Sequence, residues 1–159
     1  MSTVERDRIL ETFRTHNISF EHLTHEAVFT SEQAMRARNG KLHNGVKAMV
    51  CETERGIILA LLAADLMLDM EKLAKLILFK KIKLASREKV VARTNCEAGS
   101  VPPFGFDPPL PTYIDESVFD HEYSEFNIGL VTESVKVKTS DLRMILPQKL
   151  LKFSISASK

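Results

Sequence analysis

Cys96-Glu-Ala-Gly-Ser-Val-Pro-Pro-Phe-Gly105 is the stretch of this 159-residue sequence that carries the most specific local signal. Gly99 frees the backbone to turn with its amide exposed, and Pro102 and Pro103 stiffen the next part of the chain while removing two hydrogen-bond donors. Phe104 can anchor the loop in a core, and Gly105 lets the chain leave it. A loop that is open at glycine and rigid at proline suits backbone that approaches a ligand closely. An ordinary tight turn between two elements is the alternative.

Other motifs flank this loop in a defined order. His25 and Thr30-Ser-Glu-Gln-Ala34 come first, and Lys47 follows inside the hydrophobic stretch Gly45-Val-Lys-Ala-Met-Val50. Tyr113-Ile-Asp-Glu116 and Phe126-Asn-Ile-Gly129 lie downstream of the loop. This order resembles the YbaK family, also called the prolyl-tRNA-synthetase-associated editing domain, over most of the chain.

The resemblance implies both a fold and an activity. Members hydrolyse mischarged aminoacyl-tRNA, so the chain is expected to be a free-standing trans-editing deacylase that needs no cofactor. The expected fold is a single α+β domain over residues 1–159, with a curved mixed sheet that closes toward a barrel and carries flanking helices. Aminoacylated tRNA is the expected partner, and an aminoacyl-tRNA synthetase is a further one. A non-catalytic tRNA- or synthetase-binding module and a small-molecule binding protein are the alternatives.

The composition independently favours one globular domain. The length allows one domain with a substantial core, and 44% hydrophobic with 27% charged residues is typical of a globular protein. Two cysteines, Cys51 and Cys96, provide neither a disulfide framework nor a paired metal spacing, which fits a reducing cytoplasm. The charged start lacks the apolar core of a signal peptide, and Asp65 interrupts the longest apolar run, so no membrane association is expected.

The net charge of +1 conceals a strong asymmetry. Residues 72–93 contain eight Lys or Arg and one acid, whereas residues 115–125 contain five acids and no Lys or Arg. A basic sector on a nearly neutral protein can hold a polyanion locally, although a solvated helix face has the same composition. The candidate tRNA-binding residues are Lys72, Lys75, Lys80, Lys81 and Lys83.

The hydrophobic periodicity predicts alternating helices and strands without regular βαβ repeats, which favours an α+β domain around one mixed sheet. Helices are expected at Thr3–His16, Ser31–Arg38, Met70–Ile77 and Arg87–Arg93, with a last one capped by Ser140 and ended by Pro147. Strands are expected at Ser19–Thr24, Val46–Thr53, Ile57–Ala63, Lys81–Ala85, Thr112–Ile114, Glu125–Val131 and Ser134–Lys138. For Leu151–Ser156 there are two alternatives, a last strand or a segment that simply packs. Asn39-Gly40 is expected to end the second helix, and Asn95 to adopt a left-handed turn.

Lys47 is the candidate catalytic side chain. On an otherwise apolar strand it points either outward by simple alternation or into a cleft where its ammonium has a purpose. In YbaK-like proteins the lysine at this place is the hallmark active-site residue, so the resemblance favours the cleft. An ammonium there can hold an ester carbonyl or a phosphate and stabilise a developing oxyanion.

The loop backbone is the natural partner of Lys47. The amides of Gly99, Ser100 and Val101 could face a carbonyl or the terminal adenosine of the tRNA, giving an oxyanion-hole-like arrangement without side chains. Ser100 as a covalent nucleophile is the alternative, but no Gly-x-Ser-x-Gly elbow surrounds it. A positioned water, assisted by the terminal ribose hydroxyl, fits the residue set better.

The remaining candidates rest on weaker signals. Both cysteines are expected to be buried small hydrophobes rather than nucleophiles, and His22 and His25 lack a second ligand pair, so no metal site is expected. Asp115 is expected to be structural. By the resemblance, the substrate-binding set contains His25, Thr30, Ser100, Val101, Pro103, Asn127 and Gly129, beside the catalytic pair Lys47 and Gly99.

Overall fold

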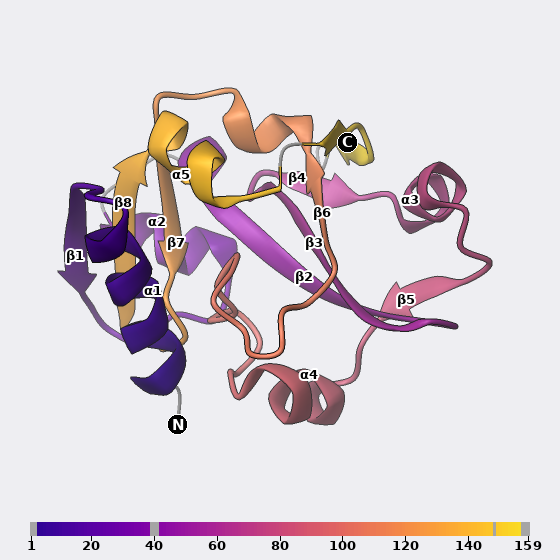
Figure 1. Cartoon of the computed structure of the whole chain (residues 1–159), viewed down its shortest axis with the longest axis horizontal. Helices are drawn as coiled ribbons and strands as arrows, with labels where there is room; N and C mark the ends of the chain where they lie inside the picture. Colours follow the sequence, from indigo (N-terminus) through magenta and orange to yellow (C-terminus); the bar gives the residue numbers. More distant parts are fainter. Residues whose placement is uncertain (1–2, 39–41, 148, 157–159) are drawn as a thin grey trace.

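The computed structural model describes residues 3–38, 42–147 and 149–156, which form an α+β domain with three separate sheets (Figure 1). The five-stranded sheet has the order β5-β2-β3-β6-β9, the three-stranded sheet the order β1-β8-β7, and the last sheet pairs β10 with β4. The strands are β1 (Phe20–Thr24), β2 (Val46–Thr53), β3 (Gly56–Ala63), β4 (Leu66–Leu68), β5 (Ile82–Leu84), β6 (Thr112–Asp115), β7 (Tyr123–Asn127), β8 (Glu133–Lys138), β9 (Leu150–Leu151) and β10 (Ser154–Ser156). The helices are α1 (Thr3–Thr15), α2 (Ser31–Arg38), α3 (Met70–Ile77), α4 (Arg87–Thr94) and α5 (Thr139–Ile145), with 3-10 turns η1 (Leu42–Asn44) and η2 (Glu116–Phe119).

The β2–β3 hairpin is the long central element of the fold (Figure 1). Its antiparallel register runs from Val46 opposite Ala63 to Thr53 opposite Gly56. β3 is apolar along its length and buried from Ile58 to Ala63, because β2 and the parallel strand β6 pair with its two edges. The two strands predicted at Val46–Thr53 and Ile57–Ala63 are confirmed, and their hairpin presents one strand, β2, to the candidate site.

The predicted starts of α3 and α4 are confirmed, and a polar side chain caps each of them. The Asp69 carboxylate accepts the Lys72 amide at 3.1 Å, and the Ser86 hydroxyl accepts the Lys89 amide at 3.3 Å. Asn95 takes the expected left-handed conformation, with φ of 59°. The short polar side chains thus define α3 and α4 locally.

Two local predictions are wrong, and a third stretch was left open. α5 begins at Thr139, so Ser140 lies within the helix instead of capping it, and Lys138 at the N-cap makes no side-chain cap bond. β7 ends at Asn127 instead of running to Val131, because the chain turns at Gly129, whose φ is +100°. The C-terminal stretch forms two short strands in different sheets. The predicted end of α2 at Asn39-Gly40 falls outside the described residues.

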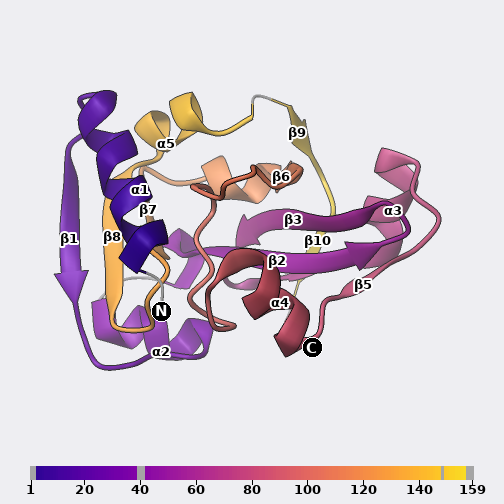
Figure 2. The same cartoon turned by 60° about the horizontal axis from the view of Figure 1, so that its bottom comes forward.

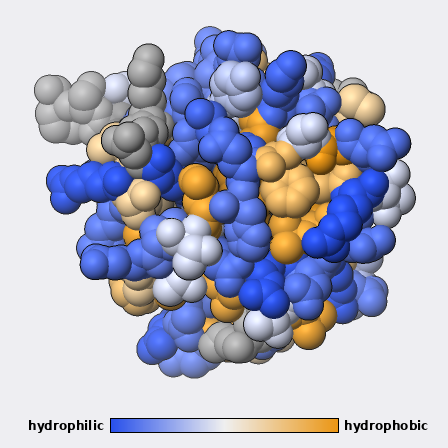
Figure 3. Space-filling view, turned by 90° about the vertical axis from the view of Figure 1, so that its left-hand side faces the viewer, coloured by the Kyte–Doolittle hydropathy of each residue, from blue (hydrophilic) through white to orange (hydrophobic). Residues whose placement is uncertain are grey.

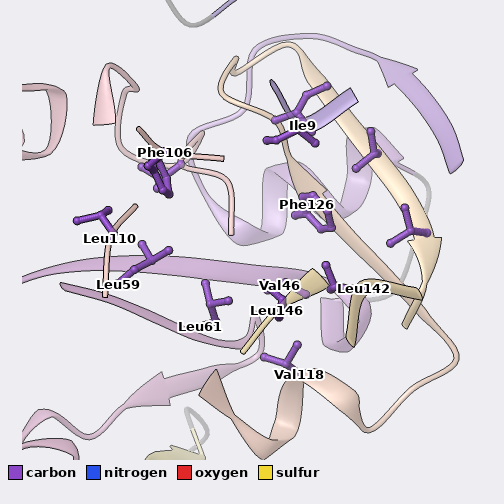
Figure 4. Close-up of a cluster of buried hydrophobic side chains, with 14 of the residues drawn as sticks. Ile9, Val46, Leu59, Leu61, Phe106, Leu110, Val118, Phe126, Leu142 and Leu146 are labelled. Carbon is purple, nitrogen blue, oxygen red and sulfur yellow. The ribbon is translucent and has the colours of Figure 1, made fainter. Parts of the chain in front are cut away.

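A shared apolar core joins the three-stranded and five-stranded sheets (Figure 4). Ile9 on α1, Phe126 on β7, Leu142 on α5 and Leu61 on β3 belong to one cluster and are fully buried. Burying a side chain of this size contributes about 1.5–3 kcal/mol each. This cluster fixes the position of the α1 and α5 layer against the hairpin.

The sheets do not close into a barrel, which corrects the expected curved sheet. Among the described residues, the only backbone bridge recorded between the three-stranded and five-stranded sheets is the isolated pair Gly45 and Glu125. β2 begins at Val46, directly after this bridge, and among the described residues it pairs with β3 and β5 and not with β7. The lining of the cavity described below includes Gly45 and Val46 at the start of β2 and Asn127 at the end of β7.

On the face that carries β1 and α1, apolar side chains reach the surface in several small patches and in one larger patch (Figure 3). Such patches are ordinary for a globular domain. Within the described ranges, no helix is long and apolar enough to cross a membrane.

Candidate active site

One cavity of about 400 Å³ lies between α2, the first half of β2 and the loop that precedes Pro102. Figure 2 shows α2 and α4 on the same side of β2, and both helices contribute to the cavity wall. The cavity brings together five of the residues predicted from sequence. These are Thr30, Lys47, Gly99, Val101 and Asn127.

Lys47 stands in this cavity on β2, partly buried. Burial lowers the pKa of its ammonium, and the nearby carboxylates of Glu32 and Asp65 oppose that shift. Among the described residues, none forms a hydrogen bond or an ion pair with the Lys47 side chain. The ammonium is therefore available to an oxygen of a bound ligand.

Gly99 holds the loop against the start of α2. Its φ is +89°, and a Cβ built on it would lie 2.9 Å from the carbonyl oxygen of Phe29. Real Cβ atoms essentially never come so close to backbone. Glycine is therefore required both by the conformation and by the close approach of two backbones.

Ser100 stabilises the glycine loop through hydrogen bonds to the backbone. Its amide and hydroxyl both donate to the Glu97 carbonyl, at 3.0 and 2.8 Å, and its own carbonyl accepts the Gly129 amide at 3.0 Å. Ser100, Pro103 and Gly129 are buried and do not line the cavity. The geometry does not support the predicted substrate contacts of these three residues, and it leaves Gly99 and Val101 as the loop residues at the cavity.

Arg38 is the site residue that the sequence analysis missed. Its guanidinium lines the cavity, donating through Nε to the Ser134 hydroxyl at 3.0 Å and through Nη2 to Asn127 Oδ1 at 2.8 Å. Burial lowers the pKa of Arg38 to about 10, and Glu125 partly opposes this. The missed signal is helical spacing, because Arg38 lies four residues after the buried Ala34 and so shares its inward face.

Asn127 and His25 orient Arg38. The Asn127 amide nitrogen donates to the carbonyls of Leu130 and Glu133, at 3.1 and 3.3 Å, so the side chain clamps the β7–β8 turn while it receives Arg38. His25 does not line the cavity; its Nε2 lies 2.8 Å from the Ser134 hydroxyl that accepts from Arg38.

Thr30 begins α2 at the cavity wall. Its hydroxyl oxygen accepts the Gln33 amide at 3.1 Å, and Gln33 Oε1 accepts the Phe29 amide at 2.8 Å. This reciprocal pair resembles a capping box. The hydroxyl proton of Thr30 remains able to donate toward the cavity.

Comparison with known proteins matches these features to one family. The sequence model described as the aminoacyl-tRNA editing domain matches residues 25–145, which include Lys47, the glycine loop and the β7–β8 turn. The chain belongs to the aminoacyl-tRNA editing domain family. This editing domain is also 34% identical over 160 residues to proteins named "Multifunctional Ser/Thr-tRNA deacylase ProXp-y" from Escherichia coli K12 and O157:H7, covering 98% of this chain and 96% of theirs.

Solved structures confirm the fold of the editing domain. The crystal structure of a protein named provisionally as a trans-editing enzyme for prolyl-tRNA synthetase superposes with a TM-score of 0.81 at 22% identity, covering 96% of this chain and 98% of that one. A structure of a hypothetical protein gives a TM-score of 0.83 at 17% identity, covering 93% and 99%. At these identities the likeness concerns the fold alone.

The predicted tRNA-binding lysines of this editing domain are all exposed. On α3, Leu73 is buried while Lys72 and Lys75 face solvent, so the helix has one apolar face and one charged face. The sector reaches the cavity through β5, whose Leu84 forms part of the wall. A role in tRNA binding remains a prediction.

The other titratable candidates of the editing domain have structural surroundings. Cys51 and Cys96 are fully buried, as expected, and burial raises the pKa of the Cys51 thiol to about 11, which disfavours a nucleophilic thiolate. Within the part of the chain that the structure describes, no cluster of three or more His, Cys, Asp or Glu could hold a metal.

Asp115 is structural, as expected. Its carboxylate accepts the amides of Ser117, Phe153 and Ser154, at 2.7–3.0 Å, which ties β6 to the C-terminal segment. Burial alone would raise its pKa, but hydrogen bonds outweigh burial and lower it.

Proposed function

We propose that this editing domain is a free-standing deacylase, one domain over residues 1–159, that hydrolyses the ester bond between a wrong amino acid and its tRNA. The observation that carries the proposal is the placement of the Lys47 ammonium in the same cavity as the Gly99 loop, with no described carboxylate or hydrogen-bond partner bound to it. Membership in the editing-domain family supports the same reaction.

The chemistry follows from this placement. A water molecule attacks the ester carbonyl carbon and the carbonyl oxygen becomes an oxyanion. Collapse of this intermediate breaks the bond to the ribose oxygen, which takes up a proton as the free amino acid leaves. The Lys47 ammonium and the Gly99 and Val101 amides would stabilise the oxyanion, and removing one such donor typically costs about 10²–10³ in rate. Positioning supplies the rest without a cofactor.

Seryl- and threonyl-tRNA are the substrates we propose, because the Escherichia coli relatives are named Ser/Thr-tRNA deacylases. The hydroxyl of Thr30 in the cavity wall is a suitable partner for the hydroxyl of either amino acid. Contact with the tRNA body would come from the exposed lysines beside β5, and an association with an aminoacyl-tRNA synthetase and a cytoplasmic location remain predictions.

A deacylation screen tests the proposal. Purified protein is mixed with tRNAs charged with serine, threonine, alanine and cysteine, and release of the amino acid is measured against the enzyme-free rate. Faster release of serine or threonine than of the others is expected. If a folded preparation binds tRNA but releases no amino acid above background, the protein is a non-catalytic binding module instead.

A further inference from the structure

Phe29 is an exposed aromatic residue of the cavity wall. Its exposed fraction is 59%, and Leu84, 50% exposed, lines the same cavity. The other described large apolar residues with comparable exposure, such as Leu78 at 81%, do not line it. Phe29 and Leu84 thus place two exposed apolar side chains at the wall of one cavity, where a bound ligand could cover them.

The backbone that carries the Phe29 ring is held from three directions. The Phe29 amide donates to Gln33 Oε1 at 2.8 Å, and the preceding Val28 amide donates to the Val131 carbonyl at 2.9 Å. The Phe29 carbonyl lies against Gly99, close enough to exclude a Cβ there. Because this backbone is already held in place, a ligand that covers the ring need not order the backbone that carries it.

The size and charge of the cavity indicate which part of a substrate would meet this ring. A volume of about 400 Å³ is near the small end of the ~300–1,000 Å³ range of ligand pockets. An aminoacyl group and its ribose can occupy that space beside Lys47, which leaves the attached base at the cavity mouth. A planar base has a π face that an exposed aromatic ring can cover.

We propose that Phe29 is a stacking platform for the terminal base of the tRNA acceptor end. This inference rests on the proposed function, because the base arrives attached to the ester that Lys47 binds. The ring contacts the base and positions the ester without taking part in the chemistry. The contact tolerates any base, since every base has a π face.

Kinetics with two small substrates test the contact. One substrate is the seryl ester of adenosine, and the other is the seryl ester of 1-O-methylribose, which has no base. Loss of base stacking on alanine substitution is expected to raise KM for the adenosine ester about 5- to 150-fold, and Phe29→Ala should leave KM for the base-free ester unchanged. Phe29→Tyr should retain wild-type behaviour, and Leu78→Ala is the matched control for loss of an exposed apolar side chain.

A binding measurement separates this inference from the proposed function. The chain contains no tryptophan, so Phe29→Trp introduces a single indole. Its fluorescence should be quenched by adenosine but not by ribose, while the control Leu78→Trp should respond to neither. If adenosine quenches the fluorescence but the protein has no deacylase activity, the base site is supported and only the proposed deacylase function is refuted. Two results would overturn the stacking proposal. One is an active enzyme in which Phe29→Ala raises KM equally for both esters, and the other is a Phe29→Trp variant whose fluorescence adenosine does not quench.

Discussion

Replacing Gly99 by alanine tests whether the glycine loop and the start of α2 form one rigid unit. A Cβ at this position would lie 2.9 Å from the Phe29 carbonyl oxygen and 3.2 Å from its carbonyl carbon and Cα. All three atoms belong to backbone, so they cannot move aside as the end of a flexible side chain can. The substitution must therefore shift Phe29 or the loop.

The cost has two parts that a control can separate. Placing alanine at positive φ costs roughly 1–2 kcal/mol, and forcing a methyl group into packed surroundings adds about 1–3 kcal/mol. Gly56 has a φ of +109° but nothing within 4 Å of its Cβ position. Gly56→Ala should therefore lose about 1–2 kcal/mol of the free energy of unfolding, and Gly99→Ala about 2–5 kcal/mol.

Urea denaturation measures both variants, and deacylation of seryl-tRNA is followed below the unfolding transition. Gly99→Ala should be less stable than Gly56→Ala and should also lose activity, since it displaces the loop amides and Phe29 together. Gly56→Ala should keep its activity, because the β2–β3 turn lies away from the cavity. Equal stability and equal activity of the two variants would refute the tight contact between Gly99 and Phe29.

Three further predictions concern charge. Lys47→Ala should lower kcat/KM by about a hundredfold or more while its urea transition stays close to wild type, and near-normal turnover by the folded variant would contradict a catalytic role. Activity should fall as pH rises through the pKa of Lys47, which burial lowers from its usual range. Glu32→Gln removes a carboxylate that raises this pKa, so the alkaline loss of activity should move to lower pH. The control Glu26→Gln should leave the profile unchanged. The double variant Lys72→Glu, Lys75→Glu should weaken tRNA binding, and the slope of log K against log salt should decrease by about one for each lost phosphate contact. Hydrolysis of a minimal aminoacylated 3′ fragment should stay unchanged. Equal loss of activity on both substrates would refute a contact with the tRNA body.

Local signals in the sequence predicted most of the elements, because each acts within a few residues. Asp69 and Ser86 cap their helices by bonds to amides three residues away, and Asn95 ends α4 in its own left-handed conformation. The strand alternation around Lys47 left two orientations open for its side chain, outward or into a cleft. The side chain lies in the cavity because α2 and the glycine loop pack over β2.

Long-range contacts account for what the sequence did not predict. Ser100 carries the polar groups expected of a binding residue, but these groups already have partners within the chain. The Ser100 amide and hydroxyl donate to the Glu97 carbonyl, and the Ser100 carbonyl accepts the Gly129 amide. Pairing between two such distant motifs cannot be inferred from either motif alone. The isolated bridge between Gly45 and Glu125, the only one recorded between the two larger sheets among the described residues, likewise has no local sequence signal.

Arg38 changes how selectivity in the cavity is to be understood. Together with Lys47 it gives the cavity two cationic residues, and no Asp or Glu is among the described residues that line it. Such a cavity favours a phosphate oxygen or a developing oxyanion and disfavours the α-ammonium group that every aminoacyl ester can carry. Selection among amino acids would then depend on neutral groups, and the Thr30 hydroxyl is one such group in the cavity wall. If the proposed function holds, the charges would promote the reaction on any ester that fits, and the size and hydrogen bonding of the cavity would decide which ester fits.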